Sequence, residues 1–508
     1  MGNKIKKILV ANRGEIAIRI FRTCRKMDIG TVAIYTHVDR KAPHVRYADE
    51  AYCISENPND TSYLKEDRII DIAKKINAAI HPGYGFYAEN GDFAQHCADA
   101  GVIFIGPLPK HIKDMGSKTS ARDIMERAGV PVVPGTKNPI RDINDAKLVA
   151  DKIGYPIMLK AVYGGGGKGM RIVMTRDDFE PLFRLATSEA QSAFAHGDLY
   201  IEKFIDKPHH IEVQVLGDCH NNFLHLFERE CSIQRRHQKL IEETPSPFID
   251  DTIREEMFKV AVNAIKSIGY ISAGTLEFIV GSDKKFYFLE MNTRLQVEHP
   301  ITEMVTGVDI VREMILVAEG KKLSFKQDEI TREGHAIECR ICAEDPTNNF
   351  VPSPGLITVY HAPEGPNVRV SSGVYDGYEV PLYYDPMIAK ACANSKTRLG
   401  AIINMRRILS EFIFLGIKTN IPFHQSVMKN KTFIKGIYDT GFIDNKFDIE
   451  DMQRRKELDH NVPIIAASIR QLLSEKKAAH SLMTEGEDQQ QKNLWKLSSR
   501  LQNLQKLF

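Results

Sequence analysis

Two acidic residues and an amide occur on neighbouring predicted strands, where they could bind a divalent cation. Glu277 lies in the segment Gly-Thr-Leu-Glu-Phe, and Glu290 precedes Asn292 in the segment Phe-Leu-Glu-Met-Asn. Alternate side chains of a strand share one face, so a hairpin of these two strands would bring all three together. Carboxylate and amide oxygens are hard ligands that suit Mg²⁺ beside nucleotide phosphates. Ion pairs with Arg294 or Arg340 are the alternative, because acids on apolar strands need a cationic partner.

A run of glycines indicates phosphate binding. Residues 164–167 are four glycines, and Lys168 and Gly169 follow them, between a predicted strand that ends at Lys160 and another at 171–174. Glycines leave successive backbone N–H groups unshielded, which suits the wrapping of phosphate oxygens. The spacing is not that of a Walker A motif, and a mobile linker is the alternative. Because glycines are costly to order, we expect a lid that closes on a nucleotide.

A dense run of polar residues, 293–300, directly follows the second acidic strand. Its arginine, Arg294, could hold a small oxyanion through two parallel hydrogen bonds. Its second acid, Glu298, could accept a proton from the bound anion. The pattern therefore indicates an anion pocket beside the candidate metal site.

Two further polar segments have simpler explanations. The charged run 230–239 is predicted to lie in a loop, where a solvated turn accounts for its charge. His210, Glu212 and Gln214 alternate along one predicted strand and so share a face. An exposed polar face would explain these three residues without any function.

Alternating elements in the first hundred residues must position one side of this site. Predicted strands at 7–11, 31–35, 78–81 and 102–105 are separated by helices, a pattern typical of a parallel sheet. The turn after the first strand is not G-x-G-x-x-G, so we predict no dinucleotide site there. A helix at 117–128 and several strands follow, and then a β-rich segment and a polar helical tail.

Composition excludes several classes of protein. Among 508 residues, 68 Lys and Arg oppose 66 Asp and Glu, and a net charge of +2 argues against nucleic-acid binding. No apolar run is long enough to span a membrane. The eight cysteines are interpreted as reduced core residues of a cytoplasmic protein. The Cys339–Cys342 spacing lacks a second pair, so we expect no metal or redox role for it.

Seven segments, taken in chain order, resemble the biotin carboxylases of the ATP-grasp superfamily. The likeness extends from the N-terminus to about Asp444. The matching segments are 8–19, 81–86, 115–118, Lys160 with its glycine run, 234–239, 290–300 and 334–340.

The resemblance implies a mixed α/β and α+β architecture of four parts. These are a Rossmann-like domain at 1–114, an ATP-grasp domain at 115–334 with a mobile lid at about 132–204, a β-rich domain at 335–445, and a helical extension at 446–508. It also implies carboxylation of biotin with ATP and bicarbonate, with Mg²⁺ or Mn²⁺ as the metal.

The resemblance assigns roles to single residues. For nucleotide binding it implies Lys118, Lys160, Gly166, Gly167, Glu202, Lys203, Phe204, Ile205, His210, Gln234 and His237. For the metal it implies Glu277, Glu290 and Asn292. For the bicarbonate pocket it implies Lys239, Arg294, Gln296, Val297 and Glu298, of which Glu298 is the base. Arg340 would face the ureido oxygen of biotin.

The chain has no Ala-Met-Lys-Met biotinylation site and no length for a carboxyltransferase. We therefore expect two partners, a separate biotin carrier protein and a carboxyltransferase subunit, and we expect a homodimer. The acceptor, an acyl-CoA or a 2-oxo acid such as pyruvate, cannot be read from these residues. In the tail, Leu494, Leu497, Leu501, Leu504 and Phe508 have coiled-coil spacing, and partner docking or folding back on the domain both explain it. Another ATP-grasp ligase and an inactive scaffold are the competing functions.

Overall fold

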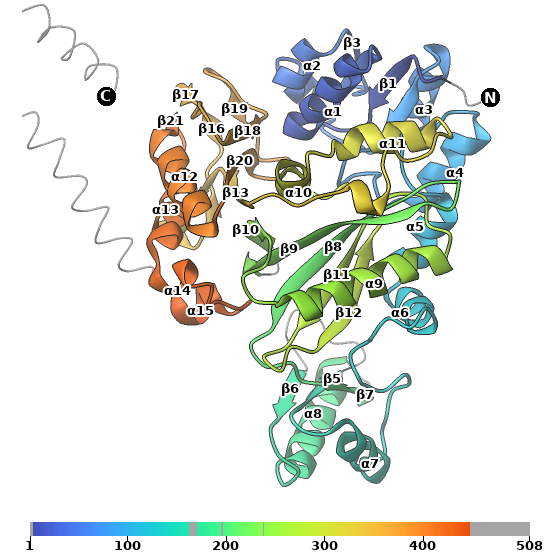
Figure 1. Cartoon of the computed structure of the whole chain (residues 1–508), viewed down its shortest axis with the longest axis vertical. Helices are drawn as coiled ribbons and strands as arrows, with labels where there is room; N and C mark the ends of the chain where they lie inside the picture. Colours follow the sequence, from blue (N-terminus) through green and yellow to red (C-terminus); the bar gives the residue numbers. More distant parts are fainter. Residues whose placement is uncertain (1–3, 162–169, 195–196, 237, 448–508) are drawn as a thin grey trace, which may run out of the picture. The chain divides into compact units, whose positions relative to one another are not determined.

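The computed structural model describes residues 4–161, 170–194, 197–236 and 238–447. It has a mixed α/β fold, with a parallel N-terminal sheet, a large antiparallel sheet and a small third sheet (Figure 1). The predictions for Gly166, Gly167, His237 and the coiled-coil positions of the tail lie outside the described residues.

The N-terminal sheet is parallel, with strand order β3-β2-β1-β4. Its strands are β1 (Lys7–Val10), β2 (Gly30–Tyr35), β3 (Glu50–Cys53) and β4 (Ala79–His81), and its helices are α1 (Gly14–Lys26), α2 (Pro43–Tyr47), α3 (Glu66–Lys75) and α4 (Gly91–Asp99). Strand β1 is buried along Ile-Leu-Val, as expected for a strand covered on both faces. Three of the predicted strands are confirmed. The fourth, 102–105, is wrong, because only Phe104 forms an isolated bridge, to Ile80.

The antiparallel sheet has eight strands in the order β12-β11-β8-β9-β10-β13-β20-β18. Its strands are β8 (His209–Gly217), β9 (Phe223–Arg235), β10 (Gln238–Thr244), β11 (Ser272–Val280), β12 (Phe286–Asn292), β13 (His335–Cys342), β18 (Val368–Ser372) and β20 (Met387–Ser395). β13 pairs directly with β10, so one sheet continues across the predicted boundary at residue 335.

Helices cover this sheet and bring the polar segments to it (Figure 1). α9 (Asp251–Ser267) packs on β8 and β9, and α10 (His299–Thr306) packs on β9, β10, β13 and β20. α6 (Lys118–Arg127) begins after Ser117, whose side chain accepts a hydrogen bond from the Ser120 amide, and it packs against β12. The predicted helix at 117–128 is thus confirmed, with Lys118 as its first residue.

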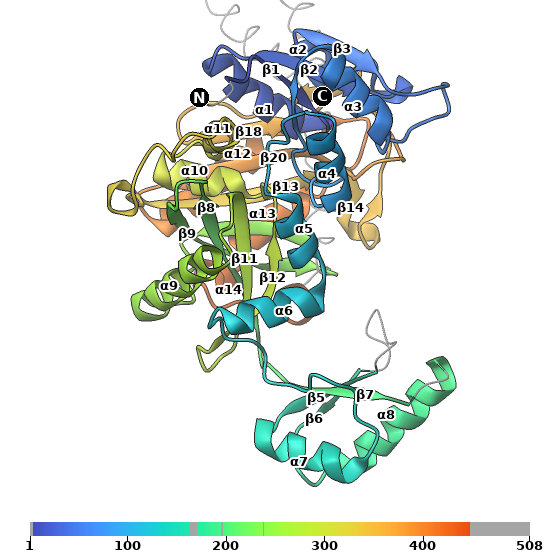
Figure 2. The ribbon, with the colours of Figure 1, turned by 90° about the vertical axis from the view of Figure 1, so that its right-hand side faces the viewer.

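The predicted lid contains a separate three-stranded sheet in the order β6-β5-β7. The strands are β5 (Ile157–Ala161), β6 (Met170–Val173) and β7 (Leu199–Lys203), and α7 (Ile143–Ile153) and α8 (Phe179–Phe194) lie on one side of them (Figure 2). Leu159, Ile201 and Phe179 belong to a hydrophobic core of this part alone. The glycine run follows β5 in the sequence.

The remaining elements complete the chain to Phe447. They are η1 (His37–Asp39), α5 (Pro109–Gly116), α11 (Ile310–Ala318), η2 (Gln327–Glu329), β14 (Glu344–Asp345), η3 (Pro346–Asn348), β15 (Val351–Pro352), β16 (Gly355–Leu356), β17 (Val359–His361), β19 (Glu379–Val380), α12 (Arg398–Glu411), β21 (Ile413–Leu415), α13 (Ile421–Lys429), α14 (Lys431–Ile434) and α15 (Phe442–Lys446). Within the described ranges, every helix is too short or too polar to cross a bilayer.

The cysteines follow the prediction in most cases. All eight are free thiols, and six of them are buried. Cys53 is only half-buried and Cys219 is exposed, so these two are not core residues. Cys219 lies in the turn after β8, and its thiol faces the Gly320 carbonyl over 3.9 Å.

Candidate active site

A largely buried lysine at the start of β10, Lys239, contacts three acidic residues from different elements. The Nζ atom of Lys239 lies 2.5 Å from Glu212 on β8, 2.8 Å from Glu277 on β11 and 2.8 Å from Glu298 at the start of α10. Burial alone would lower the pKa of Lys239, but the three carboxylates raise it well above its usual value. The ammonium group therefore stays charged and holds the carboxylates of Glu212, Glu277 and Glu298 close together.

This position corrects the prediction for residues 230–239. Residues 230–235 belong to β9 and Gln238 and Lys239 to β10, rather than to a loop. The pairing of β9 with β10 has register shifts on both sides of Ile241, and such bulges re-aim neighbouring side chains. Charged residues can occupy these strands because partners from β8, β11 and α10 compensate them.

Glu298 links Lys239 to the residue predicted to face biotin. Arg340 on β13 donates from Nη2 to Glu298 over 2.9 Å and from Nε to Glu242 over 2.6 Å. Burial would raise the pKa of Glu298, yet Lys239 and Arg340 hold it well below its usual range. Burial raises the pKa of Glu242 to about 8. Sequence reasoning missed Glu242, which lies on β10 three residues after Lys239.

Sequence reasoning missed a second residue, Arg229 on β9, which binds the Glu212 carboxylate that also contacts Lys239. Its guanidinium is fully buried and donates to Glu212 over 2.5 Å, to Gln214 over 2.8 Å and to Thr302 over 3.0 Å. The explanation of His210, Glu212 and Gln214 as an exposed polar face is therefore wrong. Glu212 and Gln214 are completely buried, because Arg229 satisfies them from the adjacent strand.

The predicted metal residues are adjacent in the hairpin of β11 and β12. Glu277 is the register partner of Glu290, and Asn292 donates from Nδ2 to Glu277 over 2.8 Å. Neither Arg294 nor Arg340 pairs with Glu277, whose partners are Lys239 and His210. Burial raises the pKa of Glu290, and the charge of Glu277 raises it further. Two carboxylates that repel each other fit a divalent cation between them.

The structure also indicates what would change when a cation binds. Asn292 Oδ1 accepts a hydrogen bond from Arg294 Nη2 over 2.8 Å, so the amide oxygen faces away from Glu277. Coordination by all three predicted ligands would require the Asn292 amide to turn over. His210, Glu212 and Glu277 form a second possible group, since their ligand atoms lie within 4.8 Å of one another.

His210, which is predicted to contact the nucleotide, lies beside the acidic hairpin. Its Nε2 lies 2.8 Å from Glu277 Oε2. Its Nδ1 lies 3.1 Å from the amide nitrogen of Gln234 on β9. The two predicted residues, His210 and Gln234, therefore contact each other, and His210 borders the candidate metal site.

Four of the five predicted bicarbonate residues, Arg294, Gln296, Val297 and Glu298, lie in one short segment after β12, and the fifth, Lys239, lies on β10. Arg294 donates from Nη1 to Gln296 over 2.8 Å and from Nε to Glu89 over 3.0 Å. Gln296 in turn donates to Glu277 over 3.1 Å. Glu89, which comes from the N-terminal part of the chain, was missed by the sequence analysis. The segment thus places a guanidinium group beside the acidic hairpin, where it can bind an anion.

The predicted nucleotide residues of the lid are held mainly within the lid. Lys160 on β5 forms an ion pair with Glu202 on β7. Lys203 donates from Nζ to the carbonyls of Gly154 and Tyr155 over 2.8 and 3.1 Å. The amide of Phe204 donates to the Pro156 carbonyl over 3.1 Å.

Two other predicted nucleotide residues adjoin the eight-stranded sheet. A Cβ atom placed on Gly281, which follows β11, would lie 3.2 Å from Ile205 Cγ2, so Ile205 borders the end of that strand. Lys118 at the start of α6 is close enough to lower the pKa of Glu290. Its charge therefore faces the candidate metal site.

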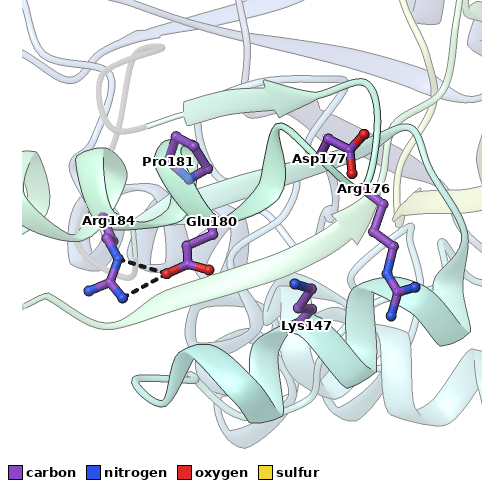
Figure 3. A pocket seen from close by; sticks show the side chains of 6 residues that line it. All are labelled: Lys147, Arg176, Asp177, Glu180, Pro181 and Arg184. Carbon is purple, nitrogen blue, oxygen red and sulfur yellow. Dashed lines mark hydrogen bonds and ion pairs between the residues drawn. The ribbon is translucent and has the colours of Figure 1, made fainter.

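A surface pocket of about 700 Å³ lies in the lid, against α7 and α8 (Figure 3). It is lined by Lys147, Arg176, Asp177, Glu180, Pro181 and Arg184. Arg184 pairs with Glu180 over 2.8 Å inside it. None of the predicted site residues lines this pocket, so the buried network rather than this pocket is the candidate active site.

Three sequence profiles match the chain in order. "Biotin carboxylase, N-terminal domain" matches residues 4–112. "Carbamoyl-phosphate synthase L chain, ATP binding domain" matches residues 117–326. "Biotin carboxylase C-terminal domain" matches residues 338–445.

Named relatives are similar over nearly their full length. The chain is 51% identical over 442 residues to Biotin carboxylase 1 of Bacillus subtilis, a match that covers 87% of this chain and 98% of that protein. It is also similar to the crystal structure of the biotin carboxylase subunit of pyruvate carboxylase, with 49% identity and a TM-score of 0.82. That match covers 87% of this chain and 98% of the other.

The chain is also similar to a second solved structure of a biotin carboxylase. It is the biotin carboxylase domain dimer of the Hydrogenobacter thermophilus 2-oxoglutarate carboxylase, in complex with MgADP, ADP and bicarbonate. Its TM-score is 0.77 at 48% identity, with 87% of this chain and 98% of that chain covered. From its profiles, its relatives and its fold, the chain belongs to the biotin carboxylase family of ATP-grasp ligases.

Proposed function

We propose that this chain carboxylates biotin on a separate carrier protein, with ATP and bicarbonate as the other substrates. The observation that carries the proposal is the position of Glu298 between the cations of Lys239 and Arg340. These two cations can bind neighbouring polar groups, one on bicarbonate and one on biotin. A carboxylate between them can exchange a proton with either.

Bicarbonate would bind at Arg294, Gln296 and Val297, with Lys239 beside it. Bicarbonate and a triphosphate repel each other, and fixed cations reduce that repulsion where charge develops. Lys239 and Arg340 hold the pKa of Glu298 well below its usual range, so the group is a carboxylate in the free protein. As a carboxylate it can accept a proton from bicarbonate bound beside it.

Nucleotide binding would use Lys118, Lys160, Glu202, Lys203, Phe204, Ile205, His210, Gln234, His237 and the glycines Gly166 and Gly167. Glu277, Glu290 and Asn292 would hold Mg²⁺ or Mn²⁺. Such a cation supplies charge neutralisation at the phosphates. Lys118 and Lys160 would orient the γ-phosphate toward the bicarbonate pocket. Closure of the lid would keep water away from the phosphate.

The proposed reaction has two stages, phosphorylation of bicarbonate and carboxylation of biotin, and Glu298 takes the bicarbonate proton in the first. An oxygen of bicarbonate attacks the γ-phosphorus, the bond to the β-phosphate oxygen breaks, and ADP leaves as carboxyphosphate forms. Carboxyphosphate then releases CO₂ and phosphate, phosphate takes the N1 proton of biotin, and N1 bonds to CO₂. Arg340 would stabilise the negative charge that develops on the ureido oxygen.

The direct test is a bicarbonate-dependent ATPase assay with free biotin as acceptor. We expect ATP hydrolysis to require Mg²⁺ and bicarbonate and to yield carboxybiotin when biotin is added. An ATP-grasp ligase for another acceptor would hydrolyse no ATP under these conditions, and an inactive scaffold would not bind MgATP. No nucleotide consumption with all three substrates would overturn the proposal.

The partners belong to the same proposal. A biotin carrier protein and a carboxyltransferase subunit would complete the reaction, with pyruvate, 2-oxoglutarate or an acyl-CoA as acceptor, and the chain would act as a homodimer. The solved relatives come from a pyruvate and a 2-oxoglutarate carboxylase, and the second of them is a dimer. Free thiols at all eight cysteines fit a reducing compartment such as the cytoplasm.

We assign residues 446–508 to partner docking. The apolar spacing at its end is that of a short coiled-coil seam. Deletion after residue 450 is expected to leave carboxylation of free biotin intact while the partner subunits no longer copurify. Unchanged copurification would exclude a docking role.

A further inference from the structure

Lys390, a buried lysine about 90 residues after the predicted bicarbonate segment, contacts the backbone of that segment. The side chain of Lys390 on β20 has no exposed surface. Its Nζ donates to the carbonyl of Val297 over 2.7 Å and pairs with Glu15 Oε1 over 3.1 Å. Val297 lies between Gln296 and Glu298, so this contact reaches the centre of the segment that would bind bicarbonate.

Two N-terminal motifs converge on the same lysine. Glu15, near the start of α1, accepts a hydrogen bond from the Tyr84 hydroxyl. Lys390 Nζ also lies 5.7 Å from the centre of the Tyr84 ring. Asn12 fixes the loop that carries Tyr84, because its Nδ2 donates to the Pro82 and Tyr84 carbonyls over 2.8 and 2.7 Å.

The peptide groups on both sides of Val297 are thereby fixed. His299 Nδ1 lies 2.8 Å from the Gln296 carbonyl oxygen, and Lys390 holds the Val297 carbonyl. Because a peptide group is planar, a fixed carbonyl also fixes the direction of the N–H that follows it. The Gln296 carbonyl thus orients the Val297 N–H, and the Val297 carbonyl orients the peptide that carries Glu298.

We propose that Lys390 is a positioning residue for bicarbonate, and that Glu15 and Tyr84 hold its ammonium group against the Val297 carbonyl. The assignment rests on the proposed function, because it presumes that bicarbonate binds at residues 294–298. It gives a role to the motifs at 12–15 and 81–86, whose residues lie outside the predicted nucleotide and metal sites. Lys390 touches no substrate in this assignment and acts through the backbone of Val297 and Glu298.

The test compares Lys390→Met with Lys284→Met in the full chain. Lys284 also donates to a backbone carbonyl, that of Phe248 over 2.6 Å, but it lies in the turn between β11 and β12. For Lys390→Met we expect kcat/KM for bicarbonate to fall by about 10- to 100-fold, as for other groups that orient a site from behind. KM for ATP should stay at the wild-type value, and Lys284→Met should change neither.

A double variant separates positioning from folding. Lys390→Met alone leaves the Glu15 carboxylate buried without its cation, which destabilises the protein. Adding Glu15→Gln removes that charge, so the midpoint of thermal unfolding should return toward the wild-type value. The kcat/KM for bicarbonate should stay low, because the Val297 carbonyl still lacks its donor.

Three results would overturn the assignment. They are an unchanged kcat/KM for bicarbonate in Lys390→Met, recovery of that value in the double variant, and equal losses for bicarbonate and ATP. The proposed function fails differently, since the wild-type protein itself would then show no bicarbonate-dependent ATP hydrolysis.

Discussion

The buried network of the eight-stranded sheet and the ion pairs of the lid stabilise the protein in different ways. In the network, Lys239, Arg229 and Arg340 bind fully buried carboxylates from neighbouring strands and from α10, and the three cations are themselves buried or largely buried. In the lid, Arg184 and Glu180 form a pair on one helix with both side chains largely exposed. Buried pairs fix distances but are costly to break, whereas exposed pairs tolerate change. The candidate active site is therefore held at fixed distances, whereas the ion pairs of the lid can change at little cost.

The largest difference between the two regions should appear in the free energy of unfolding when one arginine is removed from each. Arg229→Met removes the donor to Glu212 Oε1 and to Gln214 Oε1 and leaves Lys239 as the remaining cation at Glu212. It should lower the free energy of unfolding by about 3–5 kcal/mol. Arg184→Met should change it by less than about 1 kcal/mol. Urea unfolding of both variants measures the difference, and similar losses would contradict the distinction.

The next largest effect concerns catalysis in the network. Arg340→Ala should lower the rate of biotin carboxylation by about 10²–10³-fold, as for loss of one fixed donor to a developing oxyanion. MgATP affinity should be retained, because Arg340 contacts Glu242 and Glu298 rather than the predicted nucleotide residues. Fluorescence titration with MgATP and assay with free biotin test the two halves. Equal activity with free biotin would refute the role.

A variant of the lid should weaken the use of ATP while leaving the free energy of unfolding almost unchanged. Lys160→Met removes the partner of Glu202 and a predicted phosphate contact, so KM for ATP should rise by about 10- to 100-fold. The free energy of unfolding should change by less than about 1 kcal/mol, because both side chains are partly exposed. Steady-state kinetics and urea unfolding of the same preparation test this. A large loss of stability would place Lys160 with the buried network instead.

The effect that is smallest near neutral pH is a pH dependence of stability, and it comes from a buried histidine of the N-terminal sheet. Burial and the charge of Arg19 lower the pKa of His81 from 6.5 to about 3. Below pH 6.5 His81 binds a proton in the unfolded chain but stays neutral in the folded protein. The free energy of unfolding therefore falls as the pH falls from 6.5 to about 3. His81→Gln should reduce that slope by about 1.4 kcal/mol per pH unit. Urea unfolding at several pH values tests this, and an unchanged slope would contradict it. The described lid residues include no histidine.

Local pattern and spacing predicted much of the site but not its charge balance. Period-two alternation placed Glu277 opposite Glu290, and the register confirms it. The same reasoning failed at residues 230–239, because a strand with buried charges looks like a loop unless its partners are known. Those partners are distant, as with Lys239 and Glu298 or Arg294 and Glu89. Local sequence carries no record of such pairings.

Strand length limited the fold prediction in the same way. The segment 102–105 is apolar and ends before Gly-Pro, yet it makes a single bridge at Phe104 rather than a ladder. Hydrophobicity alone cannot separate a short strand from a buried extended segment, since both bury the same side chains. Lys390 shows the converse limit, because nothing near it in sequence indicates that it reaches Val297.

The pairing of β10 with β13 has a consequence for how this protein can be divided. Four register pairs join the two strands, from Ile241 and Cys339 to Thr244 and Ala336. A cut in the connection before His335 would leave each fragment with a bare row of backbone donors and acceptors, a template for self-association. The C-terminal segment is therefore not a portable module. Fragments made at that boundary are expected to aggregate when expressed alone and to regain solubility only when produced together.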